Sequence, residues 1–299
     1  MSSHCEHSSL RNFGTAFAVG VTLNILFVVL QVVFGIFAHS LALIADAGHN
    51  LGDVLGLVMA WGAGALSRMA PTERRTYGLR SSSILAALFN ALLLLVAVGA
   101  IAWEAIRRFH AQVEVTAPIV IWIAAIGVVV NVVTALMFMP GREHDLNIRS
   151  AFIHMAADAA ISLGVVLAGV AIFLSGRQWI DPVVSLAIAA IIVWGTWGLL
   201  RDSINLALNA VPDAINIREV RRYLASLPHV TAVHDLHVWP LSTTETALTA
   251  HLVRDVNDCD CALLQQAADD LREQFHIHHS TLQFETADHV CSLAPDELV

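Results

Sequence analysis

The chain has 299 residues, of which 57% are hydrophobic and only 14% are charged. A soluble domain carries about 25% charged residues, so this composition excludes an ordinary soluble protein and indicates several membrane spans. The formal net charge is −9, which argues against a nucleic-acid partner because nucleic acids bind basic surfaces.

Six apolar stretches are each long enough to cross a lipid bilayer, since about 20 helical residues span its hydrocarbon core. We expect these spans near Phe13–Phe37, Ser40–Leu66, Leu79–Arg107, Ala117–Met139, Asn147–Leu174 and Trp179–Leu206. The residues before the first stretch lack the pattern of a cleaved signal peptide, so we expect the first helix to be retained.

Arginines are unequally divided between the two sides of the predicted bundle. With a cytoplasmic N-terminus, the outer side holds only Arg107, Arg108 and Arg177. The inner side then holds Arg11, Arg68, Arg74, Arg75, Arg80, Arg142, Arg149 and Arg201. Positively charged loops face the cytoplasm, so we expect both termini to be cytoplasmic in a multi-pass protein, with a bacterial inner membrane as the expected location.

Beyond Pro212 the pattern changes to short amphipathic elements. In order they read as helix, strand, strand, helix and strand: AINIREVRRYLASL, VTAVHDLHVWPL, ETALTAHLVRD, CALLQQAADDLREQF and HSTLQFET. This order predicts a small α+β domain of ferredoxin-like or metallochaperone-like type, which is small enough to benefit from dimerisation. The expected organisation is a cytosolic segment at 1–12, an all-α six-helix transmembrane domain at 13–208, and a cytosolic α+β domain at 209–299; the motifs described below assign transport to the second and dimerisation and metal binding to the third.

Two of the predicted spans carry ionisable side chains deep in the bilayer. The second span has Asp46, His49 and Asp53, and the fifth has His154 and Asp158. Spacings of three and four residues place each set on one face of its helix. An ionisable group at that depth is costly and needs a partner or a task. One such pair could be a structural hydrogen bond, but two pairs of the same spacing and order favour a metal site.

The types of these side chains point to a particular ion. Two imidazoles and two carboxylates suit zinc, which prefers four ligands in a tetrahedron. Two carboxylates also neutralise a divalent cation, and without the metal two negative charges would remain at low dielectric. Protons are the natural replacement, so the ligand set predicts metal-for-proton exchange. Asp46 either orients one of the ligands from behind or caps local structure.

These motifs also carry a family resemblance. Six spans, an HxxxD on the second and another on the fifth, and a tail containing HDLHVW resemble the cation diffusion facilitator family. The chain is most similar to its zinc-selective subgroup, which includes bacterial zinc/cadmium/cobalt resistance exporters and vesicular zinc transporters. The resemblance covers nearly the whole chain. It implies a homodimer that exports Zn²⁺, with Cd²⁺ as a further candidate substrate, by proton antiport and alternating access at a transport site made of His49, Asp53, His154 and Asp158.

The resemblance also implies metal ligands in the cytosolic tail. In the family, positions equivalent to His237, His251, His278 and Glu285 bind zinc, sometimes with His234 as well. Such an ion would be a bound regulatory zinc beside the transported one. The alternative is that these histidines are ordinary surface residues of the strands.

A further set of candidate ligands lies near the two termini. The HCEH segment, with His4, Cys5 and His7, resembles an HCH motif of vesicular zinc transporters, with one inserted residue. The resemblance implies that this segment reaches a neighbouring subunit's tail site, which Cys291 and His289 would complete. The alternative is that these terminal residues are idle.

Other functions remain open from the sequence. The same fold could export chiefly cobalt, nickel or cadmium, because ligand type ranks these metals poorly. A membrane metal sensor would use the tail histidines but would leave the intramembrane pairs unexplained. A metalloenzyme would keep an open metal position beside three protein ligands, whereas four strong ligands are available here and no HExxH occurs, so we expect no enzymatic activity.

Overall fold

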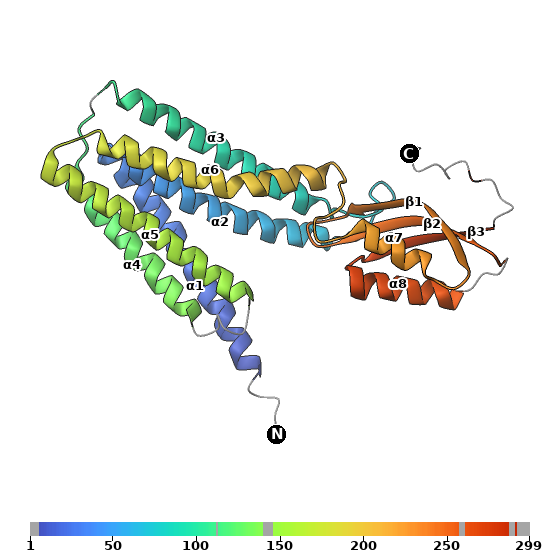
Figure 1. The fold of residues 1–299 in the computed structure, drawn as a ribbon. Helices are drawn as coiled ribbons and strands as arrows, with labels where there is room; N and C mark the ends of the chain where they lie inside the picture. Colours follow the sequence, from blue (N-terminus) through green and yellow to red (C-terminus); the bar gives the residue numbers. More distant parts are fainter. Residues whose placement is uncertain (1–5, 112, 140–145, 257–260, 287–290, 292–299) are drawn as a thin grey trace. The chain divides into compact units, whose positions relative to one another are not determined.

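The computed structural model describes residues 6–111, 113–139, 146–256, 261–286 and 291 (Figure 1). The chain divides into two compact units. The first comprises Met1–Val58 and Asn90–Gly198, and the second comprises Met59–Phe89 and Leu199–Val299.

The long helices follow the predicted spans closely. They are α1 (Glu6–Phe37), α2 (Leu41–Ser67), α3 (Ser82–Arg108), α4 (Ala117–Phe138), α5 (Leu146–Ser175) and α6 (Ile180–Ala207). Within the described residues, α2 to α6 each contain a stretch long and apolar enough to cross a membrane, and the described apolar part of α1 is Thr22–Phe37. The prediction of an all-α, multi-pass membrane domain is confirmed.

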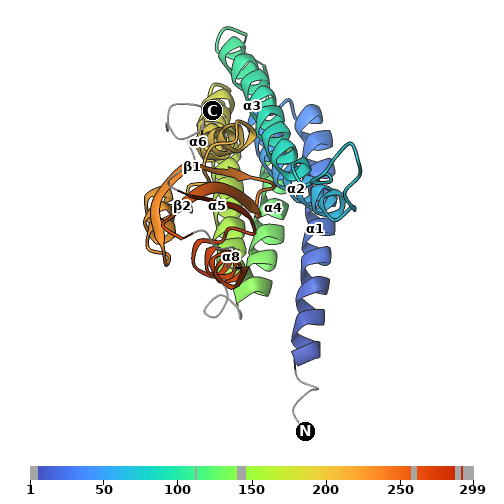
Figure 2. The ribbon, with the colours of Figure 1, turned by 90° about the vertical axis from the view of Figure 1, so that its right-hand side faces the viewer.

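The first unit is built around a helical core in which α4 lies along both α1 and α5 (Figure 2). Gly127 of α4 shows why the helices approach closely. A Cβ atom there would lie 2.4 Å from Cζ of Phe27 in α1 and 3.2 Å from Oγ of Ser162 in α5. Small residues at helix crossings allow this proximity in membranes, where packing rather than water drives association. The crossing brings α5 close to α1.

In the second unit, the loop between α2 and α3 is attached to the C-terminal domain. Nη1 of Arg80 lies 2.8 Å from Oε2 of Glu245, which is in the turn between the first two strands. The rings of Tyr77 and His279 meet edge to face with their centroids 5.7 Å apart. The α2–α3 loop and the C-terminal domain therefore form one packed body.

The C-terminal domain has the predicted order of elements. It consists of α7 (Ile217–Ala225), β1 (Val230–Pro240), β2 (Thr246–Arg254), α8 (Cys261–Phe275) and β3 (His279–Thr286). The sheet order is β1-β2-β3, with β1 antiparallel and β3 parallel to β2. Its core joins one face of the sheet to both helices, through buried residues such as Leu224 of α7, Leu271 of α8 and Leu248 of β2. The small α+β domain is confirmed.

An irregularity in β1 decides which side chains point away from that core. His234 pairs with His251, but His237 pairs with Thr249, so β1 holds one residue more than β2 between the two pairs. Asp235 lies at this bulge with a φ of 48°, in the left-handed region. Simple alternation would send His234 and His237 to opposite faces. The bulge puts both on the face of His251, opposite the apolar core.

Candidate metal centres

The first candidate centre lies between α2 and α5, within the first unit. Nε2 of His49 is 3.2 Å from Oδ1 of Asp158, and Nε2 of His154 is 3.3 Å from Oδ2 of Asp53. Within the helices, Nδ1 of His49 is 4.0 Å from Oδ2 of Asp53, and Nε2 of His154 is 3.6 Å from Oδ2 of Asp158. The structure therefore brings all four predicted transport ligands together, with each imidazole facing both carboxylates.

The atoms of this cluster are available to a cation. One ligand atom from each of His49, Asp53 and Asp158 lies within 4.8 Å of the others. The Oδ2 atoms of Asp53 and Asp158 lack a hydrogen-bond partner of normal geometry among the described residues. The side chain of Asp158 is only 2% exposed, whereas that of His154 is 43% exposed. Two carboxylates and two imidazoles are a donor set that fits a divalent cation of borderline softness.

Asp46 lies on α2 one turn before His49 but faces the helix contacts behind the cluster. Its Oδ2 accepts hydrogen bonds from Nε2 of Gln31 in α1 and from Oγ of Ser162 in α5, the latter at 3.1 Å. Gln31 in turn accepts a bond of 3.1 Å from Nδ2 of Asn50. Asp46 is fully buried, and it links α2 to the helix that carries His154 and Asp158. These contacts suit a residue that aligns the two ligand-bearing helices.

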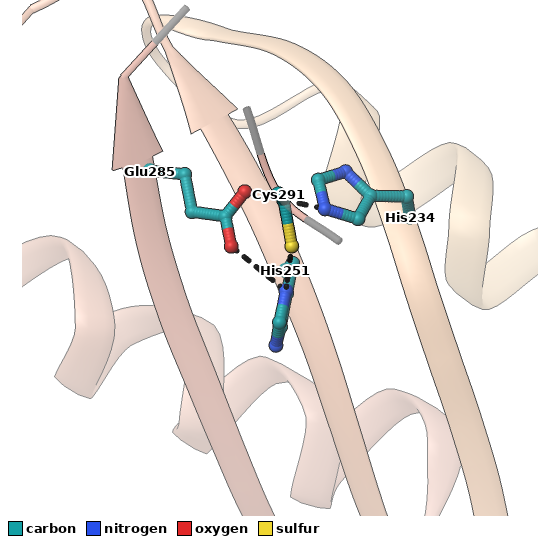
Figure 3. A group of neighbouring side chains, drawn as sticks. All are labelled: His234, His251, Glu285 and Cys291. Carbon is teal, nitrogen blue, oxygen red and sulfur yellow. Dashed lines mark hydrogen bonds and ion pairs between the residues drawn. The ribbon is translucent and has the colours of Figure 1, made fainter. Parts of the chain in front are cut away.

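The second candidate centre lies on the face of the C-terminal sheet opposite its apolar core (Figure 3). Nδ1 of His251 is 2.8 Å from Oε1 of Glu285 and 3.5 Å from Sγ of Cys291. Nε2 of His234 is 3.2 Å from Oε2 of Glu285. Ligand atoms of all four residues lie within 4.8 Å of one another. One imidazole each from β1 and β2, a carboxylate from β3 and a thiol from beyond β3 converge on one point.

Asp235 was not among the residues predicted for this centre. Its Oδ1 lies 2.8 Å from Nε2 of His237, and its Oδ2 lies 3.5 Å from Nε2 of His251. It therefore connects His237, which is 42% exposed, to the more buried part of the cluster. Asp235 is the Asp of the HDLHVW motif, so the sequence did contain this candidate. Only the bulge in β1 places Asp235 and both histidines of the motif on the sheet face of His251.

The remaining candidates are placed elsewhere or lie outside the described residues. His278 is exposed, and its backbone N–H donates to the carbonyl of Thr246 at the start of β2. Glu285 pairs with Val253 near the other end of β2. The structure therefore does not bring His278 to the cluster. His4, Cys5 and His289 lie outside the described residues, as does the side chain of His7.

Comparisons with known proteins match most of the chain to two family models. A model of the cation efflux transmembrane domain matches residues 17–206, and a model of the cation efflux protein cytoplasmic domain, a dimer domain by its name, matches residues 212–287. The chain belongs to the cation efflux family, also called the cation diffusion facilitators. The predicted family is confirmed, and the dimer domain supports the predicted homodimer.

Individual relatives match over most of their length. The cation efflux system protein CzcD of Alcaligenes sp. is 33% identical over 271 residues, covering 90% of this chain and 85% of the relative. The zinc transporter ZitB of Escherichia coli is 36% identical over 272 residues, covering 90% and 86%. A cadmium, cobalt and zinc/H(+)-K(+) antiporter of Bacillus subtilis is 31% identical over 271 residues, covering 88% and 86%.

The family match establishes the class of activity. The protein is a multi-pass membrane transporter that exports metal cations. Its relatives are named as efflux proteins and transporters, which confirms the expectation that the chain is not an enzyme.

Proposed function

We propose that the protein exports Zn²⁺ from the cytoplasm in exchange for protons, by alternating access at the cluster between α2 and α5. The observation that carries the proposal is the convergence of His49, Asp53, His154 and Asp158 from two different helices. Each imidazole nitrogen lies within 3.2 to 3.3 Å of a carboxylate oxygen of the other helix. Four such side chains supply the tetrahedral set that zinc prefers.

Proton coupling follows from the charge of the cluster. Two carboxylates neutralise one divalent cation, so the loaded site carries no net charge. When the cation leaves, protons on the imidazoles or carboxylates restore neutrality in a region that solvates charge poorly. An empty and unprotonated site would hold two negative charges at low dielectric. The free-energy cost of burying these charges opposes the return of the empty transporter to its inward-facing state without protons.

The relatives support zinc and leave room for other cations. ZitB is named as a zinc transporter, whereas the Bacillus protein is named for cadmium, cobalt and zinc. Two neutral imidazoles favour zinc over harder cations such as Mg²⁺ and Ca²⁺, which prefer oxygen ligands. Cadmium, cobalt and nickel are the competing substrates, and parallel transport measurements with each would rank them.

The expected setting is the inner membrane of a bacterium, with both termini in the cytoplasm. The excess of arginine in the loops on the side of the termini supports this orientation. The cytosolic cluster around Glu285 would then sample cytoplasmic zinc in a homodimer. A regulatory role requires that the ion bind one conformation more tightly than another. Titrating zinc while following dimer dissociation tests that role, and an unchanged dissociation constant would exclude it.

The test of the main proposal is zinc uptake into inverted proteoliposomes under an imposed pH gradient. Wild type is compared with Asp53→Ala and Asp158→Ala, and with Asp202→Ala, which removes an exposed carboxylate of α6. We expect gradient-dependent uptake by wild type and the control, and none by the two site variants. Normal uptake by folded Asp53→Ala or Asp158→Ala would refute the site, and uptake indifferent to the gradient would refute proton exchange.

A further inference from the structure

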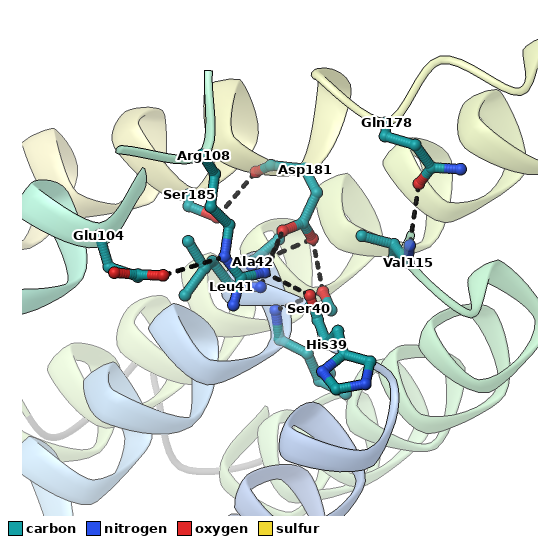
Figure 4. A network of polar contacts seen from close by, with 11 residues as sticks. His39, Ser40, Leu41, Ala42, Glu104, Arg108, Val115, Gln178, Asp181 and Ser185 are labelled. Carbon is teal, nitrogen blue, oxygen red and sulfur yellow. Dashed lines mark hydrogen bonds and ion pairs between the residues drawn. The ribbon is translucent and has the colours of Figure 1, made fainter. Parts of the chain in front are cut away.

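A buried carboxylate joins α6 to the start of α2 at the end of the first unit that carries the α1–α2 turn (Figure 4). Asp181, in the first turn of α6, is only 1% exposed. Its Oδ2 accepts the backbone N–H of Leu41 at 2.8 Å, and its Oδ1 accepts that of Ala42 at 3.3 Å. Oγ of Ser40 donates to Oδ1 as well. These residues are some 140 positions apart in the sequence.

An arginine at the end of α3 completes the arrangement. Nη1 of Arg108 donates to the carbonyl of His39 and lies 4.0 Å from Oδ2 of Asp181. Glu104, one turn earlier on α3, lies 3.4 Å from Nε of Arg108. We call Asp181, Arg108, Glu104 and Ser40, with the backbone of 39–42, the polar clamp. Asp181, Arg108 and Glu104 are its charged groups, and His39 is exposed beside it.

The charges of the clamp match the helix ends on which they act. The N-terminus of a helix favours negative charge and the C-terminus favours positive charge. Asp181 lies at the N-termini of both α2 and α6, and Arg108 lies in the last turn of α3. Three helices are thus held at one point by groups of the appropriate sign.

The clamp does more than cap the N-terminus of α2. Oγ of Ser40 already accepts the backbone N–H of Leu43 at 3.2 Å, so α2 has a cap from its own chain. The carboxylate adds a connection to another helix at the cost of burying a charge. Beside it lies a cavity of about 280 Å³ that Arg108, Gln178 and Asp181 help to line. Water in such a cavity would hydrate the carboxylate when α2 moves away.

The clamp acts on the same helix as two of the proposed transport ligands. His49 follows Leu41 by eight residues, a rise of about 12 Å along a rigid helix. A shift of the N-terminus of α2 therefore moves His49 and Asp53 with it. In the proposed orientation the clamp lies on the extracytoplasmic side, where the ion has to leave.

We infer that Asp181 is a positioning residue that holds α2 against α6 and closes the extracytoplasmic side of the bundle, and that export requires this clamp to open. The inference rests on the proposed transport site and orientation. It predicts that weakening the clamp shifts the protein toward a state open to the outside. Loss of a hydrogen bond to a charged group changes such an equilibrium by about ten- to a hundredfold.

The experiment measures access from outside and transport separately. Ala45→Cys places a thiol on α2 between the clamp and His49, at a position that is fully buried. A membrane-impermeant thiol reagent is added to intact cells that carry this reporter alone, with Asp181→Asn, or with Ser185→Ala. Ser185 is the matched control because it is buried on the same helix and its Oγ donates only to the backbone carbonyl of Asp181, at 2.7 Å.

We expect Asp181→Asn to raise the rate of thiol modification by about tenfold or more and to lower zinc turnover. Zinc should still bind, because all four ligands are retained. Ser185→Ala should match the reporter alone in both readouts. Equal modification rates in Asp181→Asn and Ser185→Ala would overturn the inference.

Two further variants keep the test decisive. If Asp181→Asn fails to fold, Arg108→Gln weakens the same clamp from α3 and must give the same rise in modification, or the inference fails. Asp53→Ala in the transport assay tests the proposed function by itself, because modification of the reporter requires no transport. Retained transport by Asp53→Ala would refute the transport site and leave the clamp to be judged by the thiol readout.

Discussion

Replacing Asp158 by Asn should nearly abolish zinc binding at the intramembrane cluster while keeping the shape of the side chain. Asp158 is the most buried of the four ligands and faces both imidazoles, at 3.2 and 3.6 Å. The substitution removes one of the two charges that neutralise the cation. Two unit charges 4 Å apart interact by about 4 kcal/mol at an effective dielectric constant of about 20. A loss of that size corresponds to an affinity about a thousandfold lower.

The measurement is equilibrium zinc binding to the purified full-length protein, in competition with a chelator of known affinity. The cytosolic cluster would mask the effect, so the comparison uses a His251→Ala background in which that cluster lacks a central ligand. Asp202→Asn, on the exposed side of α6, serves as the control and should bind zinc like its parent. A loss of less than about tenfold for a folded Asp158→Asn protein would refute the electrostatic reasoning.

Three further outcomes are expected. Zinc affinity of the intramembrane cluster should fall as the pH is lowered from 8 to 5.5, because protonated His49 and His154 cannot bind a metal; a flat titration would refute their role. Glu285→Gln should lower the number of zinc ions bound per protein, because it weakens the cluster around Glu285, while zinc uptake into proteoliposomes persists. An unchanged number of bound ions would show that this cluster does not hold zinc. Tyr223→Phe should lower the free energy of unfolding of the C-terminal domain by about 1 kcal/mol, because the phenol donates a 2.6 Å hydrogen bond to Asp270 between α7 and α8. Burial and this bond also raise the pKa of Tyr223. Denaturant titration measures the change, and an unchanged free energy of unfolding would show that the bond contributes nothing.

Hydropathy was sufficient to locate the membrane helices. The predicted end of the first span at Phe37 and the predicted start of the fourth at Ala117 coincide with the ends of the helices in the structure. A membrane span must be apolar over about 20 consecutive residues, so the signal is long, local and readable without the fold. The order of the five elements in the C-terminal domain was readable for a similar reason, because each shows the period of a helix or a strand.

The chemistry of the intramembrane cluster was also readable from single residues. Histidine and aspartate are rare at bilayer depth, so His49, Asp53, His154 and Asp158 stood out wherever the helices came to lie. The convergence of their side chains is a property of the packed helices, which the close approach at Gly127 helps to define.

Only the tertiary structure decided which residues of the C-terminal domain meet. His278, predicted as a ligand, lies at the other end of the sheet from Glu285, whereas the unpredicted Asp235 lies between His237 and His251. A strand pattern with period two assigns faces correctly only in a regular strand. The bulge at Asp235 breaks that period, and a bulge depends on the pairing of β1 with β2 rather than on β1 alone.

The polar clamp is the clearest case of information absent from local sequence. Asp181 and Arg108 follow ordinary local rules as charges at helix ends, and nothing near them in the chain identifies their partners. Their contacts with residues 39–42 exist because α2, α3 and α6 end at the same place. The sequence by itself therefore determined the helices and the chemistry available to them. The packing of helices distant in the chain determined which of these groups share a site, because such contacts depend on the whole fold.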